Sequence, residues 1–202
     1  LIDAPTWALD LKYPISVEAR STALTPRTDE TGPLASIVYY DFPARGDKPP
    51  VKLTWWDGGM APPRPAELPD GEPLGNKNGG VIFVGDKGKI IASDENAQKP
   101  RILPDSLAKD VGEVPKTIPR SEGHFKEWIA ACKGGQPAGA NFDYAGPLTE
   151  VILLGNMAIR MGNAGDPQPT KKFLWDGPNM KCTNVEEANQ LVSIEYRRGW
   201  SL

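Results

Sequence analysis

The residues at the end of one predicted strand have the chemistry that a sugar ring needs. Residues 51–59 read Val-Lys-Leu-Thr-Trp-Trp-Asp-Gly-Gly, which places two indoles beside a carboxylate. An indole covers the apolar C–H face of a sugar, and a carboxylate accepts hydrogen bonds from its hydroxyls. Because side chains alternate along a strand, Trp55 and Trp56 should face opposite ways, one toward the core and one toward a ligand. The alternative is that Asp57-Gly58-Gly59 is merely a turn.

A Ser/His/Asp hydrolase would have to use His124 as its base, since the chain has 1 histidine. His124 falls in the first turn of a predicted helix, where the positive end of the helix dipole disfavours protonation. No Gly-x-Ser-x-Gly turn supports a nucleophile. We therefore expect His124 either to contact a substrate or to pack at the helix start.

The segment Asn141-Phe142-Asp143-Tyr144 precedes a second predicted helix. Asp143 can cap that helix, which would leave Asn141 and Tyr144 to face a cleft. The chain's 2 cysteines, Cys132 and Cys182, lack metal-type spacing and are predicted to be reduced, partly buried thiols. With so few histidines and cysteines, we predict no metal site.

A dinucleotide site of the Rossmann type needs a Gly-x-Gly-x-x-Gly turn between strand and helix, and the sequence has none. Gly80 and Gly85 have phosphate-loop spacing, but Asp86 stands where a lysine is required and would repel phosphate. The net charge of −3 and the absence of basic runs argue against nucleic acid as a partner. No apolar stretch approaches the ~20 residues of a membrane helix, which predicts a soluble protein.

Alternation of polar and apolar residues predicts strands over 15–24, 35–42 and 51–56, paired as an antiparallel meander. Residues 57–78 are rich in Gly and Pro and should form a long loop. A hairpin follows, with strands at 81–84 and 89–93 around Gly85-Asp86-Lys87-Gly88. Strands grouped before helices favour an α+β fold, with an open, predominantly antiparallel sheet and helices on one face.

Two helices are predicted after the hairpins. The first begins at Ser121 as its cap and runs to Lys133, with Phe125, Trp128, Ile129 and Cys132 at helical spacing. The second starts near Pro147 and runs to Met161, apolar on most sides and thus expected to pack on the sheet. A strand at 172–175 and a short helix at 185–191 should follow.

Taken in order, several stretches resemble the C-terminal domain of the glucose–fructose oxidoreductase / inositol dehydrogenase family (Gfo/Idh/MocA), in its bacterial environmental-type branch. They are residues 1–9, 50–59, 79–90, 121–134, 138–160 and 195–202. The resemblance implies a dihydrodipicolinate-reductase-like domain that forms the substrate pocket and the oligomer contacts. It also implies a separate N-terminal Rossmann domain that binds NAD or NADP.

The family's catalytic residues are a lysine in a Glu-Lys-Pro motif and an Asp and a His that follow the Rossmann domain. This sequence departs from the family there. Asp3 and Pro5 match only the end of an Asp-x-Gly-x-His-x-x-Asp-x-Pro pattern, whose histidine would stand immediately before Leu1. Neither the lysine motif nor the Rossmann glycines are present, so this chain should bind no cofactor and hold no catalytic residue.

These observations predict that residues 1–202 form a single substrate-binding and oligomerisation domain of an NAD(P)-dependent oxidoreductase for a sugar, polyol or glycoside. The expected partners are the missing Rossmann domain, a small carbohydrate, and further copies that join through the open sheet face. The alternatives are an NAD-dependent glycosidase of the same family and a stand-alone carbohydrate-binding or scaffold domain. Relatives in this branch often carry twin-arginine leaders, so the resemblance is compatible with the periplasm or the cytoplasm. The predicted substrate contacts are Lys52, Trp56, Asp57, His124 and Asn141, with Asp3 and Tyr144 as support behind them.

Overall fold

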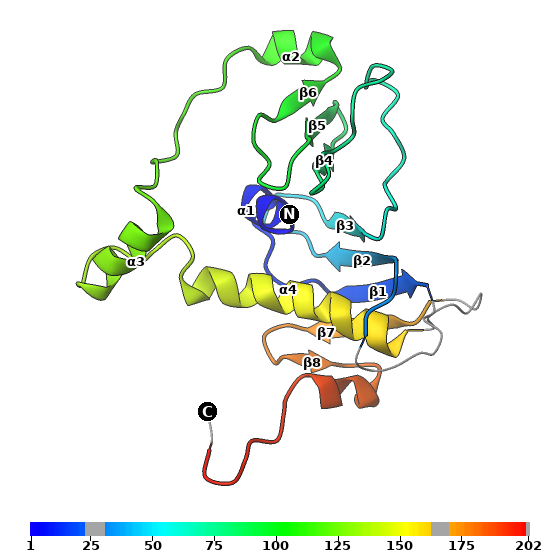
Figure 1. Cartoon of the computed structure of the whole chain (residues 1–202), viewed down its shortest axis with the longest axis vertical. Coiled ribbons are helices and arrows are strands. Elements are labelled where there is room, and N and C mark those ends of the chain that lie inside the picture. Colours follow the sequence, from blue (N-terminus) through cyan, green and yellow to red (C-terminus); the bar gives the residue numbers. More distant parts are fainter. Residues whose placement is uncertain (23–30, 163–169, 201–202) are drawn as a thin grey trace. The chain divides into compact units, whose positions relative to one another are not determined.

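The computed structural model describes residues 1–22, 31–162 and 170–200 (Figure 1). Two ends of predicted segments, 23–24 and 201–202, lie outside the described residues. The chain packs as two compact units. Unit 1 comprises residues 1–10 and 63–148, and unit 2 comprises residues 11–62 and 149–202. The boundary falls inside the long helix α4 (Phe142–Met161), after Leu148.

Unit 2 contains a five-stranded sheet in the order β3-β2-β1-β7-β8. Its strands are β1 (Ser16–Ser21), β2 (Ser36–Phe42), β3 (Val51–Trp56), β7 (Lys172–Asp176) and β8 (Lys181–Cys182). Every pairing is antiparallel, and the first three strands form the predicted meander. The α+β fold is confirmed.

One face of this sheet forms the core of unit 2. Along β2 the buried positions alternate, as a strand with one covered face requires, so Val38, Tyr40 and Phe42 are buried. The C-terminal part of α4 covers this face (Figure 1) with the residues Val151, Leu154, Gly155, Met157 and Ala158. A Cβ atom added at Gly155 would come within 2.2 Å of the Tyr40 hydroxyl, so only glycine lets the helix approach this closely.

The opposite face of the same sheet carries polar and aromatic side chains. The register places Lys52 across from Asp41 and Asp41 across from Ser16, and Glu18 lies opposite Lys172. The buried residues of α4 lie on the other face, where Gly155 meets Tyr40 and Val38. We call this surface the open face, and it is formed by Lys52, Thr54 and Trp56 of β3, Ile37, Tyr39 and Asp41 of β2, Ser16, Glu18 and Arg20 of β1, and Lys172 and Leu174 of β7.

Unit 1 contains a smaller antiparallel sheet of β4 (Val81–Val84), β5 (Lys89–Ala92) and β6 (Arg101–Leu103). Its core consists of Leu68, Ile91 and Leu103, with Leu74 and Ile82 packed against them. The Gly- and Pro-rich loop over 57–78 thus supplies core residues as well as a connection. The predicted hairpin of β4 and β5 is confirmed.

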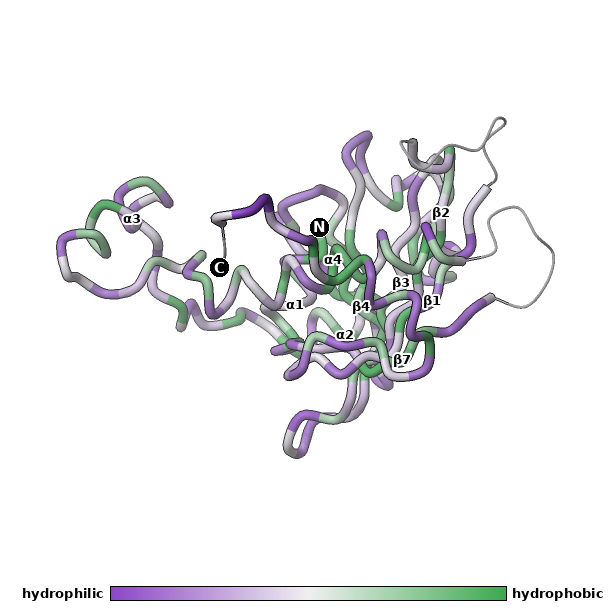
Figure 2. The backbone as a smooth tube through the Cα atoms, turned by 90° about the horizontal axis from the view of Figure 1, so that it is seen from below, coloured by the Kyte–Doolittle hydropathy of each residue, from purple (hydrophilic) through white to green (hydrophobic). Residues whose placement is uncertain are grey.

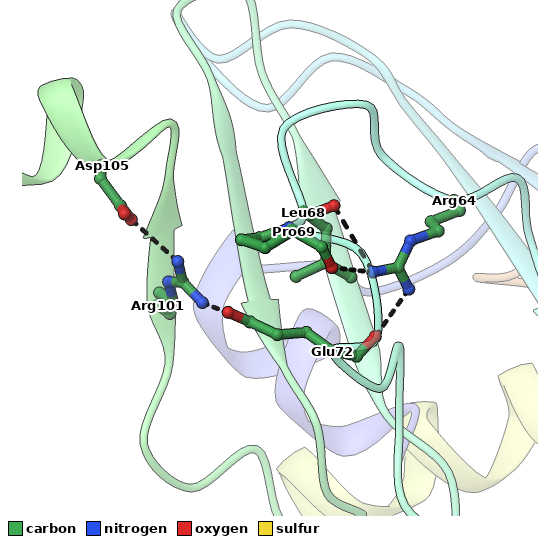
Figure 3. Close-up of polar contacts among 6 residues, drawn as sticks. All are labelled: Arg64, Leu68, Pro69, Glu72, Arg101 and Asp105. Carbon is green, nitrogen blue, oxygen red and sulfur yellow. Dashed lines mark hydrogen bonds and ion pairs between the residues drawn. The ribbon is translucent and has the colours of Figure 1, made fainter.

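Charged side chains hold this loop to the small sheet (Figure 3). Arg64 donates to the carbonyl oxygens of Leu68, Pro69 and Glu72. Arg101 of β6 contacts the Glu72 carboxylate at 2.5 Å and that of Asp105, the first residue of helix α2 (Asp105–Val111), at 3.0 Å.

Two predictions about the helices are wrong. Helix α3 (His124–Cys132) begins three residues after Ser121, with Gly123 at its N-cap position and no side-chain cap. Helix α4 begins at Phe142, so Pro147 lies inside it instead of at its start. Figure 2 shows hydrophobic residues along the backbone of α3. Their side chains are exposed, with Phe125 72% exposed, because helical spacing predicts an apolar stripe but not what covers it.

Four short elements were not predicted: α1 (Asp3–Leu9), β6, α2 and β8. The helix predicted at 185–191 is a 3₁₀ helix, η1 (Glu186–Leu191). Among the described residues, no helix combines the length and the apolar composition that a membrane crossing requires.

Candidate functional site

Trp56 and Lys52 stand on the open face of unit 2. Trp56 pairs with Ile37 and is half-buried, while Trp55 pairs with the buried Val38 on the side that α4 covers. The prediction that the two indoles face opposite ways is therefore confirmed. Lys52 and Thr54 are exposed on the same side of β3 as Trp56. This row offers an aromatic surface with an ammonium group and a hydroxyl beside it, which is the chemistry that binds a polyhydroxylated ring.

The Asp57 carboxylate points away from that row and is engaged within the sheet. Its Oδ1 accepts a hydrogen bond from the Ser36 backbone N–H at 2.6 Å. Its Oδ2 accepts from the Ser36 hydroxyl at 2.7 Å and from the Trp55 indole N–H at 3.1 Å. Gly58 follows with a φ of +67°, and a Cβ there would meet the backbone of Leu34 and Ala35. A substrate contact by Asp57 stays a prediction.

Asp41 forms the charged centre of the open face. Its Oδ2 accepts from the Ser16 hydroxyl at 2.8 Å and from the Lys172 ammonium at 2.9 Å. The hydrogen bond from Lys172 lowers the pKa of Asp41, and the same bond raises the pKa of Lys172. Lys52, across from Asp41 in the register, adds a further favourable charge.

In unit 1 the structure brings together two residues that the sequence singled out, Asp3 and Tyr144. The Tyr144 hydroxyl donates to Asp3 Oδ1 and so links the start of α1 to the first turns of α4. Burial, and then the hydrogen bond to Asp3, raise the pKa of Tyr144, which keeps the phenol protonated over the physiological range. The pair can still accept hydrogen bonds through the remaining carboxylate oxygen and the phenol lone pair.

Asn141 lies three residues before Tyr144 and caps the helix that contains it. Its Oδ1 accepts from the Asp143 backbone N–H at 3.0 Å, and its Nδ2 donates to the Ala138 carbonyl at 3.0 Å. The prediction that Asp143 is the cap is therefore wrong, because the helix begins earlier than expected and Asn141 occupies the preceding position. One amide hydrogen of Asn141 has no bond among those described and can meet a ligand.

His124 is the exposed first residue of α3, with its ring 4.1 Å from that of Phe125. The nearby Glu127 accepts from the Gly139 backbone N–H at 2.9 Å. The hydrogen bond from Ser121 and then that from Gly139 lower the pKa of Glu127. Glu127 thus fixes α3 to the turn that leads into Asn141, within unit 1.

The structure places the predicted site residues in two groups. Asp3, Asn141, Tyr144 and His124 belong to unit 1, whereas Lys52, Trp56 and Asp57 belong to unit 2. Sequence reasoning missed Ser36, Asp41 and Lys172. Alternation along β2 would have placed Asp41 on the open face, but its partner Lys172 is 131 residues distant and follows only from the strand register.

Neither a metal nor a dinucleotide has an evident binding place in the described part of the chain. No three His, Cys, Asp or Glu side chains gather there in a metal-binding group. The described strands pair only antiparallel, and a Rossmann site needs parallel strands with a crossover helix. The described strands therefore form no Rossmann site. Cys182 is buried, whereas Cys132 is exposed, so the expectation that Cys132 packs is wrong.

No family model matches the chain, and no curated protein does. A solved chain described as "Structure of putative oxidoreductase from Thermotoga maritima" is similar in structure, with a TM-score of 0.40 and 15% sequence identity. The match covers 79% of this chain and 42% of that chain, so it accounts for less than half of the solved chain's length. A likeness this weak carries no argument about function.

Proposed function

We propose that this chain is the substrate-binding and oligomer-forming part of an NAD(P)-dependent oxidoreductase that acts on a sugar or polyol. One observation carries the proposal: α4 covers one face of the five-stranded sheet, and the other face presents aromatic and charged side chains. A sheet face that no helix of its own unit covers commonly serves as a binding wall. The family resemblance of the sequence supplies the reaction class.

In this proposal the β3 edge of the open face receives the carbohydrate. The Trp56 indole covers an apolar face of the ring, and the exposed Lys52 and Thr54 bond its hydroxyl groups. In unit 1, Asn141 and His124 stay predicted substrate contacts, and the proposal assumes no contact between them and the β3 edge. Tyr144 and Asp3 support them by fixing the first turns of α4.

The cofactor belongs to a different part of the parent enzyme in this proposal. A separate Rossmann domain holds NAD or NADP together with the groups that remove the hydroxyl proton. The residues described here bind and orient the substrate, and none is assigned to catalysis.

The remainder of the open face, toward β1 and β7, is proposed to pair with a second copy. Opposite charges lie side by side there, with Asp41 bonded to Lys172, and Glu18 and Arg20 on the same strand. A two-fold pairing can exchange such bonds between copies. Lys172→Glu should therefore lower the mass of the assembly in analytical ultracentrifugation. Lys48→Glu, in the exposed β2–β3 turn, makes the same charge change and should leave the mass unaltered.

The test of the proposed function uses the complete product of the gene that encodes this chain. Incubated with NAD or NADP and a panel of sugars and polyols, it should form NAD(P)H, and Trp56→Ala should raise KM far more than it lowers kcat. Net hydrolysis of a glycoside without accumulated NADH would favour the glycosidase alternative. Sugar binding without turnover of any substrate would contradict the oxidoreductase assignment and leave a carbohydrate-binding module.

A further inference from the structure

The Asp57 side chain joins the end of an edge strand to its neighbour. Strand β3 is at the edge of the five-stranded sheet and ends at Trp56. Strand ends at a sheet edge fray readily, because few contacts oppose local opening. Here the pairing continues past the last strand residue, since the Asp57 backbone N–H donates to the Ser36 carbonyl at 3.1 Å.

Three further bonds close this junction through the Asp57 carboxylate. They come from the Ser36 backbone N–H, the Ser36 hydroxyl and the Trp55 indole N–H, at 2.6, 2.7 and 3.1 Å. Ser36 is 1% exposed, so these charge-assisted bonds are shielded from competing water. An ionised carboxylate accepts at about four positions, and three of them are taken.

We infer that Asp57 is a positioning residue that holds the Trp56 indole on the open face, and that it is not itself a substrate contact. Trp56 lies between two residues that this junction fixes, Trp55 by its indole and Asp57 by its backbone and carboxylate. Because side chains alternate along a strand, the Trp56 side chain can then point only toward the open face. The inference rests on the proposed role of Trp56 in binding a sugar.

Asp57→Asn tests the junction, because an amide has one accepting oxygen, so in either orientation its NH2 group meets an N–H donor, that of the Ser36 backbone or that of the Trp55 indole. We expect the Trp55 indole N–H resonance to move and its hydrogen exchange to quicken. The Trp56 indole should become more accessible to a neutral collisional quencher, and the affinity for sugar should fall roughly tenfold, the size of one lost charge-assisted hydrogen bond. Asp47→Asn, in the exposed turn of the same hairpin, removes the same charge and should change none of these.

Two variants that each remove a single hydrogen bond test the junction if Asp57→Asn unfolds the protein. Ser36→Ala removes one hydroxyl bond and Trp55→Phe removes one indole bond, and each should give a smaller change in the same direction. Unchanged quenching of Trp56 in all three variants would overturn the inference.

The inference and the proposed function fail in different ways. If Trp56→Ala leaves sugar binding intact, the proposed site is wrong, and the indole resonances still test the junction. If Trp56→Ala abolishes binding while Asp57→Asn changes neither the quenching nor the affinity, the site stands and the positioning role is refuted. Loss of affinity in Asp57→Asn with unaltered indole resonances and quenching would mean that Asp57 contacts the sugar directly.

Discussion

Different interactions stabilise the interior of each of the two units. In unit 2, large apolar side chains such as Phe42 and Phe173 are almost fully buried between the five-stranded sheet and α4. In unit 1, the core comprises Leu68, Ile91 and Leu103, and the loop over the small sheet is fixed by Arg64 and Arg101. A small sheet buries too little apolar surface to hold a long loop by packing alone. Hydrogen bonds and ion pairs therefore fix the loop in unit 1.

This contrast separates the two proposed roles of the molecule. The apolar core of unit 2 gives the open face a rigid backing, because close-packed interiors resist deformation. The polar bonds of unit 1 are exposed to salt and solvent, and the contacts around α3 and the start of α4 are accordingly less secured.

Phe173→Ala should cause the largest loss of stability. Phe173 is 0% exposed in the core of unit 2, and removing a buried phenyl ring costs about 3–5 kcal/mol. Hydrogen exchange followed by mass spectrometry on peptides of β1 and β2 should show the loss. Leu174→Ala, on the open face of the same strand, should cost far less. Equal losses in the two variants would mean that α4 does not cover the core face.

Leu103→Ala tests the smaller core. Leu103 is fully buried in unit 1, and a Leu→Ala change in a core costs about 2–5 kcal/mol. We expect a value in the lower part of that range, because only four other apolar residues surround this side chain in the cluster. Faster exchange should be confined to peptides of β4, β5 and the preceding loop. Val84→Ala, an exposed position on β4, is the control, and faster exchange throughout unit 2 would contradict the division.

The sequence was sufficient where periodicity was strong and local. Alternation located β1, β2 and β3, and the turn at Gly85–Gly88 located the hairpin of β4 and β5. It was insufficient for the two-residue strand β8 and the three-residue strand β6, which are too short to show a period. Such strands form because a neighbouring strand offers free backbone groups, and that information is not in their own residues.

The same limit applies to the site. Alternation placed Trp55 and Trp56 on opposite faces correctly, since this needs only the strand itself. It could not place the Asp57 carboxylate on Ser36, which is 21 residues earlier and is reached through the register of the hairpin. Nor could it join Tyr144 to Asp3, since 141 residues separate them. Residue type indicated candidates, and long-range pairing decided their partners.

Arg101→Met should weaken unit 1 less than Leu103→Ala does, and the effect should depend on salt. The Arg101 side chain is 37% exposed in its ion pair with Glu72, so solvent screens much of the attraction. The difference between variant and wild type should shrink as ionic strength rises. Lys87→Met, in the exposed turn of the β4–β5 hairpin, should show no such dependence. A difference that persists in high salt would indicate that packing of the arginine stem, not charge, fixes the loop.

Asp41→Asn should have the smallest effect, a small loss of stability near neutral pH that disappears in acid. Because Lys172 lowers the pKa of Asp41, the pair stabilises the fold above the unfolded value of about 4 and loses this contribution as the pH falls further. Because the pKa of Lys172 is raised, the ion pair also loses its stabilising contribution as the pH rises above about 10, where the ammonium deprotonates. The pair is partly exposed, so the contribution should stay below about 1 kcal/mol. Denaturant titrations at a series of pH values should show that the free energy of unfolding falls less steeply in acid for the variant than for the wild type. The same acid dependence in both proteins would refute the contribution of the Asp41–Lys172 pair.

A titration of this chain with sugars and polyols, followed through its isotope-labelled indole N–H resonances, shows whether the open face binds substrate. If the open face is the substrate wall, the Trp56 resonance shifts saturably, and Trp56→Ala abolishes binding. Trp128→Ala, which removes an equally large exposed indole from α3, should leave binding intact. A Trp56 resonance that stays fixed while the chain binds its sugar, or undiminished binding by Trp56→Ala, would contradict the account.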